Sequence, residues 1–154
     1  MIKRIVLRHG KEASLLRKHP WIFSGAVYSV EEGIIEGDLV EVQTAKEERI
    51  ATAHFGGGSI LGRVIRFGSE DVDQGYWNAT FTQAWNMRRN AGLGQCTDTN
   101  CFRLINAEGD GLPGLIVDVY GSGCTVQSHS EGMQRNLPNI LAALVQLDEL
   151  ELKT

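Results

Sequence analysis

Residues 102–121 read FRLINAEGDGLPGLIVDVYG, and this stretch decides how the second half of the chain folds. Two β-prone runs, 101–107 and 114–120, flank a loop in which glycines bracket a proline, so the pattern predicts two strands joined by a sharp turn. Glu108 and Asp110 lie two positions apart in that loop, and an extended backbone would place both carboxyl groups on one face. Paired carboxylates are compatible with acid–base chemistry, whereas Asp-Gly favours turn structure.

On the C-terminal side of this stretch, a third strand is expected over 123–128, joined to the preceding strand by the tight hairpin YGSG. A helical stretch follows from about 131 to 147. Pro138 within it requires either a kink or a helix that begins near Asn136 as its cap. The second half of the chain therefore contains a three-stranded sheet followed by a helix.

On the N-terminal side, aromatic and small apolar residues of 76–94 recur at spacings of three and four, which predicts an amphipathic helix that belongs to the core. Gly92 is its expected C-terminal cap. The polar, acidic segment 68–75 is the best candidate for a linker. The sequence thus predicts a first domain over 1–67 and a second over 76–154.

The first 67 residues contain short β-prone segments separated by turn residues, at 2–7, 21–30, 38–44, 50–55 and 60–67. A short helix is expected before Pro20, ending near Lys18 because a residue that precedes proline avoids the helical region. Five strands and one helix predict a small closed β-barrel. The fold class is α+β, with this barrel followed by a small α/β domain made of a helix, a three-stranded sheet and a helix.

The amino-acid composition indicates which class of protein this is. A hydrophobic content of 42% and a charged content of 22% are typical of a soluble globular chain. No apolar run approaches the ~18 residues that span a membrane, and the N-terminus lacks the apolar stretch of a signal peptide, so a cytoplasmic location is expected. The three cysteines, Cys96, Cys101 and Cys124, are an odd number without a second zinc-like pair. They are expected to be reduced thiols, and no metal site is predicted.

Charge is unevenly distributed along the chain. Residues 1–66 hold ten Lys or Arg against eight Asp or Glu, whereas residues 67–154 hold five against eleven, which together give the net charge of −4. Within residues 1–20, six basic residues accompany a single acid, Glu12. A basic segment on an acidic chain indicates a localised site for a polyanion, although a solvated surface would show the same pattern.

Motifs for catalysis and cofactor binding are missing from the sequence. GGGS at 56–59 has no following lysine and leads into a strand, so it is not a phosphate-binding loop. GLGQ at 92–95 has too few glycines and no preceding strand for a dinucleotide or AdoMet turn. The four histidines are dispersed and no Gly-x-Ser-x-Gly motif occurs. The sequence therefore predicts no catalytic residue and no cofactor within these 154 residues.

The stretch CFRLINAEGDGLPGLIVDVYG resembles the hallmark of a bacterial family of class I AdoMet-dependent 23S ribosomal-RNA methyltransferases that modify cytosine at carbon 5. The matching positions are Arg103, Leu104, Asn106, Glu108, Asp110, Gly111, Leu112, Pro113, Gly114, Leu115, Val117, Asp118, Tyr120 and Gly121. The segment SLLRKHPWIFSGAV is similar to the PUA domain of the same family, through Arg17, His19, Pro20, Trp21, Phe23, Ser24 and Gly25, as are Ser59, Ile60 and Arg63. The resemblance covers essentially the whole chain.

This resemblance implies that the chain is the N-terminal fragment of such an enzyme, a PUA-like RNA-binding barrel plus a middle domain. The family's catalytic Rossmann-like domain, with its S-adenosyl-L-methionine site and catalytic cysteine, would be absent. The implied partners are ribosomal RNA and that missing domain, with self-association possible and no membrane. The basic cluster and the PUA resemblance together give the candidate RNA contacts Arg8, Lys11, Arg17, Lys18 and His19.

The loop formed by Glu108, Asp110, Gly111, Pro113 and Gly114 is then expected to turn the chain between strands. Its acids would repel phosphate, so they are expected to face the missing domain or an internal partner such as Arg103. Two alternatives stay open at this point. One is a complete, non-catalytic adaptor for RNA or protein, and the other is an acid–base hydrolase that uses both acids beside a histidine or metal.

Overall fold

The computed structural model describes residues 2–94, 98–147 and 150. The chain forms two compact units, and each is described by itself. The first unit contains residues 1–71 and 130–135, and the second contains 72–129 and 136–154. This division differs from the domain limits predicted from the sequence, because 130–135 groups with the first unit. None of the described helices is long and apolar enough to cross a membrane.

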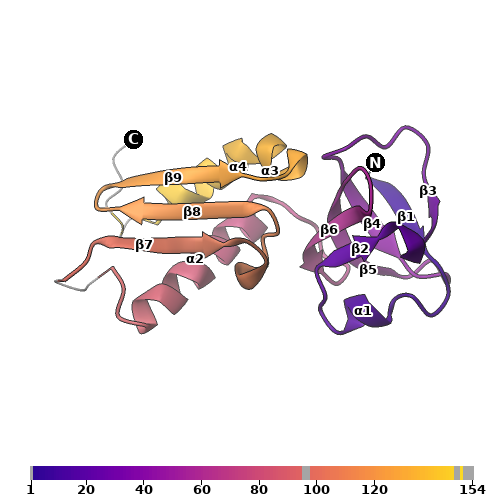
Figure 1. The fold of residues 1–154 in the computed structure, drawn as a ribbon, viewed down its shortest axis with the longest axis horizontal. Helices are drawn as coiled ribbons and strands as arrows, with labels where there is room; N and C mark the ends of the chain where they lie inside the picture. The colour runs from indigo at the N-terminus through magenta and orange to yellow at the C-terminus, as the bar shows by residue number, and fades with distance from the viewer. Residues whose placement is uncertain (1, 95–97, 148–149, 151–154) are drawn as a thin grey trace. The chain divides into compact units, whose positions relative to one another are not determined.

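The first unit is built around a six-stranded sheet (Figure 1). Its elements are β1 (Lys3–Leu7), α1 (Ala13–Leu16), β2 (Trp21–Phe23), the 3-10 helix η1 (Ser24–Ala26), β3 (Val27–Val30), β4 (Leu39–Gln43), β5 (Arg49–Phe55) and β6 (Ile60–Phe67). The strand order is β2-β6-β5-β4-β1-β3. β1 and β4 pair in parallel, and the other neighbours pair antiparallel.

The predicted strand over 21–30 is interrupted, which is why the sheet has six strands instead of five. Residues 24–26 form η1, and the Ser24 backbone N–H donates to the Ser59 carbonyl at 2.9 Å. β2 and β3, on either side of η1, are the two ends of the strand order. The sheet is therefore a curled one whose two edges are joined through η1, and the ladder itself does not close.

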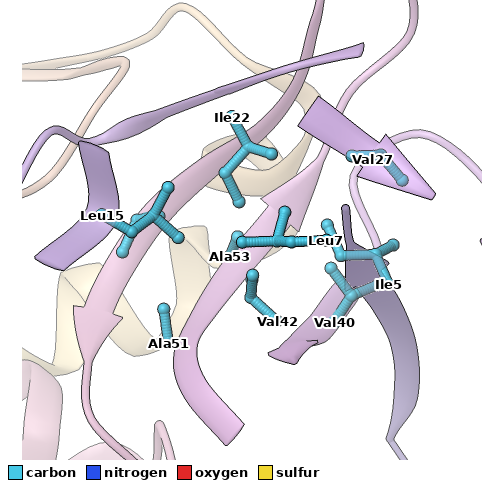
Figure 2. Close-up of a cluster of buried hydrophobic side chains, with 10 residues drawn as sticks. Ile5, Leu7, Leu15, Ile22, Val27, Val40, Val42, Ala51 and Ala53 are labelled. Atoms are coloured by element: carbon cyan, nitrogen blue, oxygen red, sulfur yellow. The ribbon is translucent and has the colours of Figure 1, made fainter. Parts of the chain in front are cut away.

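Alternation along the strands sends every second side chain into a common core. Figure 2 shows side chains from β1 to β5 and from α1 converging inside the curled sheet. These include Ile5, Leu7, Leu15, Ile22, Val27, Val40, Val42, Ala51 and Ala53, each at most 6% exposed. Leu15 alone joins α1 to this core. Deleting such a side chain typically costs about 2–5 kcal/mol, so this core fixes the position of the basic segment that leads into and out of α1.

The outer face of β5 is covered by the short helix α3 (Glu131–Arg135). His54 is 2% exposed, and a Cβ added to Gly132 would lie 2.2 Å from its Cγ atom. Arg135 adds an ion pair from α3 to Asp38, at 2.8 Å, and pairs with Glu131 of the same helix at 3.1 Å. This close approach requires glycine at position 132. The same contact explains why the segment 130–135 belongs to the first unit.

The second unit consists of a three-stranded antiparallel sheet with helices on one face (Figure 1). Its elements are α2 (Gln74–Asn90), β7 (Cys101–Asn106), the 3-10 helix η2 (Ala107–Asp110), β8 (Leu115–Tyr120), β9 (Gly123–Ser128) and α4 (Leu137–Val145). The strand order is β7-β8-β9. The predicted strands and helices are all present, which confirms the α+β class.

The ends of α2 and α4 follow from their sequences. Asp73 caps α2 by accepting the Tyr76 backbone N–H at 2.8 Å. Gly92, beyond its last turn, has the left-handed φ of +84° that a C-terminal cap requires. Of the two possibilities for Pro138, the second is correct, because α4 is a separate helix that begins after Asn136 and carries proline in its first turn.

Candidate nucleic-acid interface

The predicted RNA contacts all lie in the first unit and are exposed. Arg8 follows β1, and its backbone N–H donates to the Ala26 carbonyl at 2.8 Å. The Lys11 backbone N–H closes a turn onto the Arg8 carbonyl at 3.0 Å. Arg17, Lys18 and His19 lie at the C-terminal end of α1. The structure therefore places the candidates at both ends of one helix.

The chain leaves α1 through a Schellman turn. The Lys18 backbone N–H donates to Leu15 at 2.8 Å, and the His19 backbone N–H donates to Ser14 at 3.0 Å. Lys18 occupies the left-handed position of this turn, with φ of +65°, where glycine is the usual residue. A lysine held there costs about 1–2 kcal/mol of backbone strain. Strained residues of this kind cluster at functional sites.

Aromatic rings lie close to Lys18 and His19. The ring centroid of His19 lies 6.0 Å from that of Trp21 and 6.2 Å from that of Phe23. The ring centroids of Trp21 and Phe23 are 6.4 Å apart. The Lys18 Nζ atom lies 4.7 Å from the centroid of Phe67, a cation–π contact. We call Arg17, Lys18, His19, Trp21 and Phe23 the basic–aromatic patch.

The patch has both of the groups that RNA binding uses. Phe23 is 49% exposed, which is unusual for a phenylalanine on a domain with a complete core. His19 Nδ1 lies 3.2 Å from the backbone nitrogen and 3.3 Å from the carbonyl oxygen of Trp21, so the backbone of Trp21 holds the ring through whichever of these bonds its tautomer allows. Exposed rings can stack on bases while neighbouring cations bind phosphate. Phe23 was missing from the predicted contacts, although its place in an alternating strand of aromatic residues could have indicated it.

The loop between β7 and β8 is organised around Asp110, whose side chain is 3% exposed. Arg88 of α2 binds it through two hydrogen bonds, from Nη1 to Oδ1 at 2.7 Å and from Nη2 to Oδ2 at 2.5 Å. The backbone N–H of Asn106 also donates to Oδ2, at 2.6 Å. The Nε atom of Arg88 donates to the carbonyl of Arg103 at 3.0 Å. This bidentate pair ties the loop to the helix.

Asp110 thus has an internal partner, but the partner is Arg88 and not Arg103, the residue that the sequence suggested. The guanidinium of Arg103 binds Asp118 at 2.9 and 3.2 Å, and Arg88 is the partner of Asp110. The hydrogen bond to Asp118 raises the pKa of Arg103. The pairing of Arg88 with Asp110 could not be predicted, because their separation of 22 residues hides the contact in the sequence.

Glycines complete the turn. Gly111 and Gly114 have φ of +74° and +85°, and Leu112 and Pro113 between them are buried. The Leu112 backbone N–H donates to Ala107 at 3.0 Å. Glu108 is exposed whereas both oxygens of Asp110 accept hydrogen bonds from the protein. The two acids therefore occupy different environments, and the geometry gives Asp110 a structural role.

The described residues include two of the three cysteines. Cys101 and Cys124 are free thiols at exposed positions, and Cys96 lies outside the described residues. Within residues 2–94, 98–147 and 150, no three His, Cys, Asp or Glu side chains are grouped so that they could hold a metal ion.

The first unit, and the chain as a whole, are similar to known proteins. Residues 5–67 match the model of the PUA-like domain, so the curled sheet is PUA-like. The chain is 36% identical over 146 residues to the ribosomal RNA large subunit methyltransferase I of Yersinia pseudotuberculosis, and equally to that of Yersinia pestis. Each match covers 94% of this chain and 36% of the relative, so the chain spans about a third of the length of these proteins.

Solved structures share the fold across both units. A candidate SAM-dependent methyltransferase from Streptococcus mutans superposes with a TM-score of 0.79 at 20% identity, over 96% of this chain and 38% of its own. A second candidate methyltransferase, complexed with SAH, gives the same TM-score at 19% identity and the same coverage. At this level of identity the likeness concerns the fold alone.

Proposed function

We propose that the first unit binds structured ribosomal RNA, on behalf of an AdoMet-dependent enzyme that methylates cytosine at carbon 5 in large-subunit RNA. The observation that carries the proposal is the basic–aromatic patch on a PUA-like domain. The 36% identity to ribosomal RNA methyltransferases supports the choice of RNA as the polyanion. The specific base and carbon follow from the resemblance of the sequence around residues 102–121.

The described residues do not fit AdoMet. A binding turn for this cofactor needs a strand, a glycine loop and a helix in succession. Of the helices with eight or more described residues, α2 follows β6 through a segment that contains Glu70, Asp71 and Asp73, and α4 follows another helix. We therefore derive no methyl-transfer step from these residues. We propose that the cofactor and the catalytic groups are supplied by a further domain of the parent enzyme.

The patch itself explains how RNA would be held. Arg17 and Lys18 are the cations closest in sequence to the three rings of the patch, and each can neutralise one phosphate. Contacts of this kind position an RNA without reading its sequence. His19 and Phe23 add a stacking surface for an unpaired base. The patch is therefore suited to recognise the shape of a folded RNA that exposes one or more unstacked bases.

The test compares two double variants of equal net charge. Arg17→Gln/Lys18→Gln removes two positive charges from the patch, and Thr82→Glu/Gln83→Glu adds two negative charges to the exposed face of α2 in the second unit. Affinity for a fluorescently labelled hairpin of large-subunit ribosomal RNA is measured by anisotropy. The patch variant is expected to bind at least about tenfold more weakly at ~100 mM salt, and the α2 variant to bind as the unmodified chain does. Equal losses in both variants would contradict the proposal, because they would indicate a general effect of charge.

A further inference from the structure

The first unit contains a cavity separate from the basic–aromatic patch. Its volume is about 530 Å³, within the range of small-ligand sites. Three basic side chains line it, Arg4, Arg8 and His9, together with the ring of Tyr28 and the carboxylate of Glu47. Of these, only Arg8 was predicted from the sequence as a contact.

The spacing of β1 explains the basic wall. Ile5 and Leu7 point into the core and are fully buried, so Arg4 and Arg8 lie on the opposite face of the strand together with Val6 between them. Arg4 pairs with Glu31 at 3.8 Å, and the two side chains are about half exposed. A pair of this length and exposure is weak, so Arg4 remains available to an anion.

A β-bulge places Tyr28. The partners of Val6 and Leu7 across the ladder are Ser29 and Val27, so Tyr28 is the extra residue of β3. Because the alternation is broken there, Tyr28 and Ser29 both line the cavity. Tyr28 is 72% exposed and presents an open ring face. Bulges commonly redirect a side chain towards a functional site.

The remaining wall is the hairpin between β4 and β5. The Thr44 hydroxyl accepts the backbone N–H groups of Lys46 and Glu48, at 3.2 and 3.4 Å. The Glu47 backbone N–H donates to the Thr44 carbonyl at 2.9 Å. Glu47 has a left-handed φ of +62°, a second position where glycine would be less strained. The cost of retaining glutamate there is consistent with a use for its carboxylate.

We infer that this cavity binds one nucleotide of single-stranded RNA, with the base stacked on Tyr28, a phosphate held by Arg4 and Arg8, and base N–H groups donating to Glu47. The inference rests on the proposed RNA-binding function. The chemistry fits the lining residues, because arginine binds phosphate oxygens well and every base offers a face for stacking. An acceptor-only carboxylate favours bases with an exocyclic amine, such as cytosine or adenine.

The experiment uses the full chain, labelled with ¹⁵N, and titrates it with cytidine 5′-monophosphate, with inorganic phosphate as the comparison. We expect the nucleotide to shift amide signals of residues 4–9, 28–29 and 44–48, and to bind more tightly than phosphate. Tyr28→Ala should weaken nucleotide binding about tenfold, the typical loss for one stacked base. Tyr120→Ala, at a comparably exposed tyrosine of the second unit, should leave it unchanged.

A second measurement separates this inference from the proposed function. A hairpin RNA is compared with the same hairpin carrying a single-stranded extension, and Tyr28→Ala is expected to abolish the gain in affinity that the extension gives. One outcome would overturn the cavity inference alone: Tyr28→Ala changes neither the affinity for the nucleotide nor the gain from the extension, while Arg17→Gln/Lys18→Gln weakens binding of the hairpin. The RNA-binding proposal would then stand. Identical shifts and affinities for phosphate and nucleotide would also overturn the inference, leaving only an anion site. If the chain binds no RNA at all, the proposed function itself fails.

Discussion

Two charged segments of this chain use their charges in opposite ways. The basic segment 8–19 leaves its cations exposed around a helix that a single leucine anchors to the core. The acidic loop 107–114 directs Asp110 inward, onto Arg88, and buries the pair. A charge that is paired and buried stabilises a loop, whereas a charge that is exposed beside aromatic rings remains available to a ligand. The partner of a charge, more than its presence in a motif, therefore indicates its role.

The largest expected effect concerns the buried pair. Asp110→Asn leaves the guanidinium of Arg88 largely buried without its counter-charge, which typically costs about 3–5 kcal/mol. The free energy of unfolding is measured by urea denaturation and followed by tryptophan fluorescence, to which Trp77 and Trp85 of the same unit contribute. Arg103→Gln is the matched control, because it breaks the more exposed pair with Asp118 and should cost less than about 1 kcal/mol. Equal losses in the two variants would remove the distinction between the pairs.

The second prediction concerns pH and the buried histidine of the first unit. Burial, with the positive charge of Arg63 as a smaller cause, lowers the pKa of His54 from 6.5 to about 4. The folded state therefore favours the neutral ring. Its contribution is complete above pH 6.5 and is lost as the pH falls towards 4, by about 3 kcal/mol in total.

The free energy of unfolding is measured between pH 7 and 4 for the unmodified chain and for His54→Gln. The variant should show a shallower decline than the unmodified chain, because its buried group no longer titrates. A parallel decline for the unmodified chain and His54→Gln would show that His54 is not the group responsible.

The smallest expected effect on stability comes from Lys18→Gly. Relief of the left-handed backbone, worth about 1–2 kcal/mol, is offset by the greater flexibility of glycine and by loss of the contact with Phe67. The free energy of unfolding should change by less than about 1 kcal/mol. RNA affinity should fall all the same, because one phosphate contact is lost, and Lys18→Arg should retain it. A glycine variant that binds RNA normally would show that the strain at this position has another cause.

Much of the fold could be predicted because its signals are local. The strands around residues 102–121, the helix that ends before Gly92 and the helix that begins after Asn136 all follow from periodicity and turn residues. The interruption of the strand over 21–30 could not be predicted, since the hydrogen bond from Ser24 to Ser59 joins segments 35 residues apart. The return of 130–135 to the first unit depends on the contact between Gly132 and His54, which no local pattern reveals.

The candidate contacts also differ in how far the sequence can indicate them. Arg8, Lys11 and residues 17–19 could be predicted as candidates because they form a basic cluster in the sequence. Tyr28 and Glu47, which line the proposed nucleotide site, could not be predicted, because a bulge and a turn with left-handed backbone bring them beside Arg8 from distant positions. Contacts between distant segments determine the partner of Asp110 and the lining of the cavity, and a single sequence does not encode these in a readable pattern.

The salt dependence of RNA binding tests the central claim most directly. If exposed cations of segment 8–19 neutralise about three phosphates of a ribosomal RNA hairpin, the logarithm of the affinity should fall with the logarithm of salt concentration at a slope of roughly −2 to −3. In Arg17→Gln/Lys18→Gln that slope should shrink by about 2. A slope near zero for the unmodified chain, or one that the double variant leaves unchanged, would contradict the account.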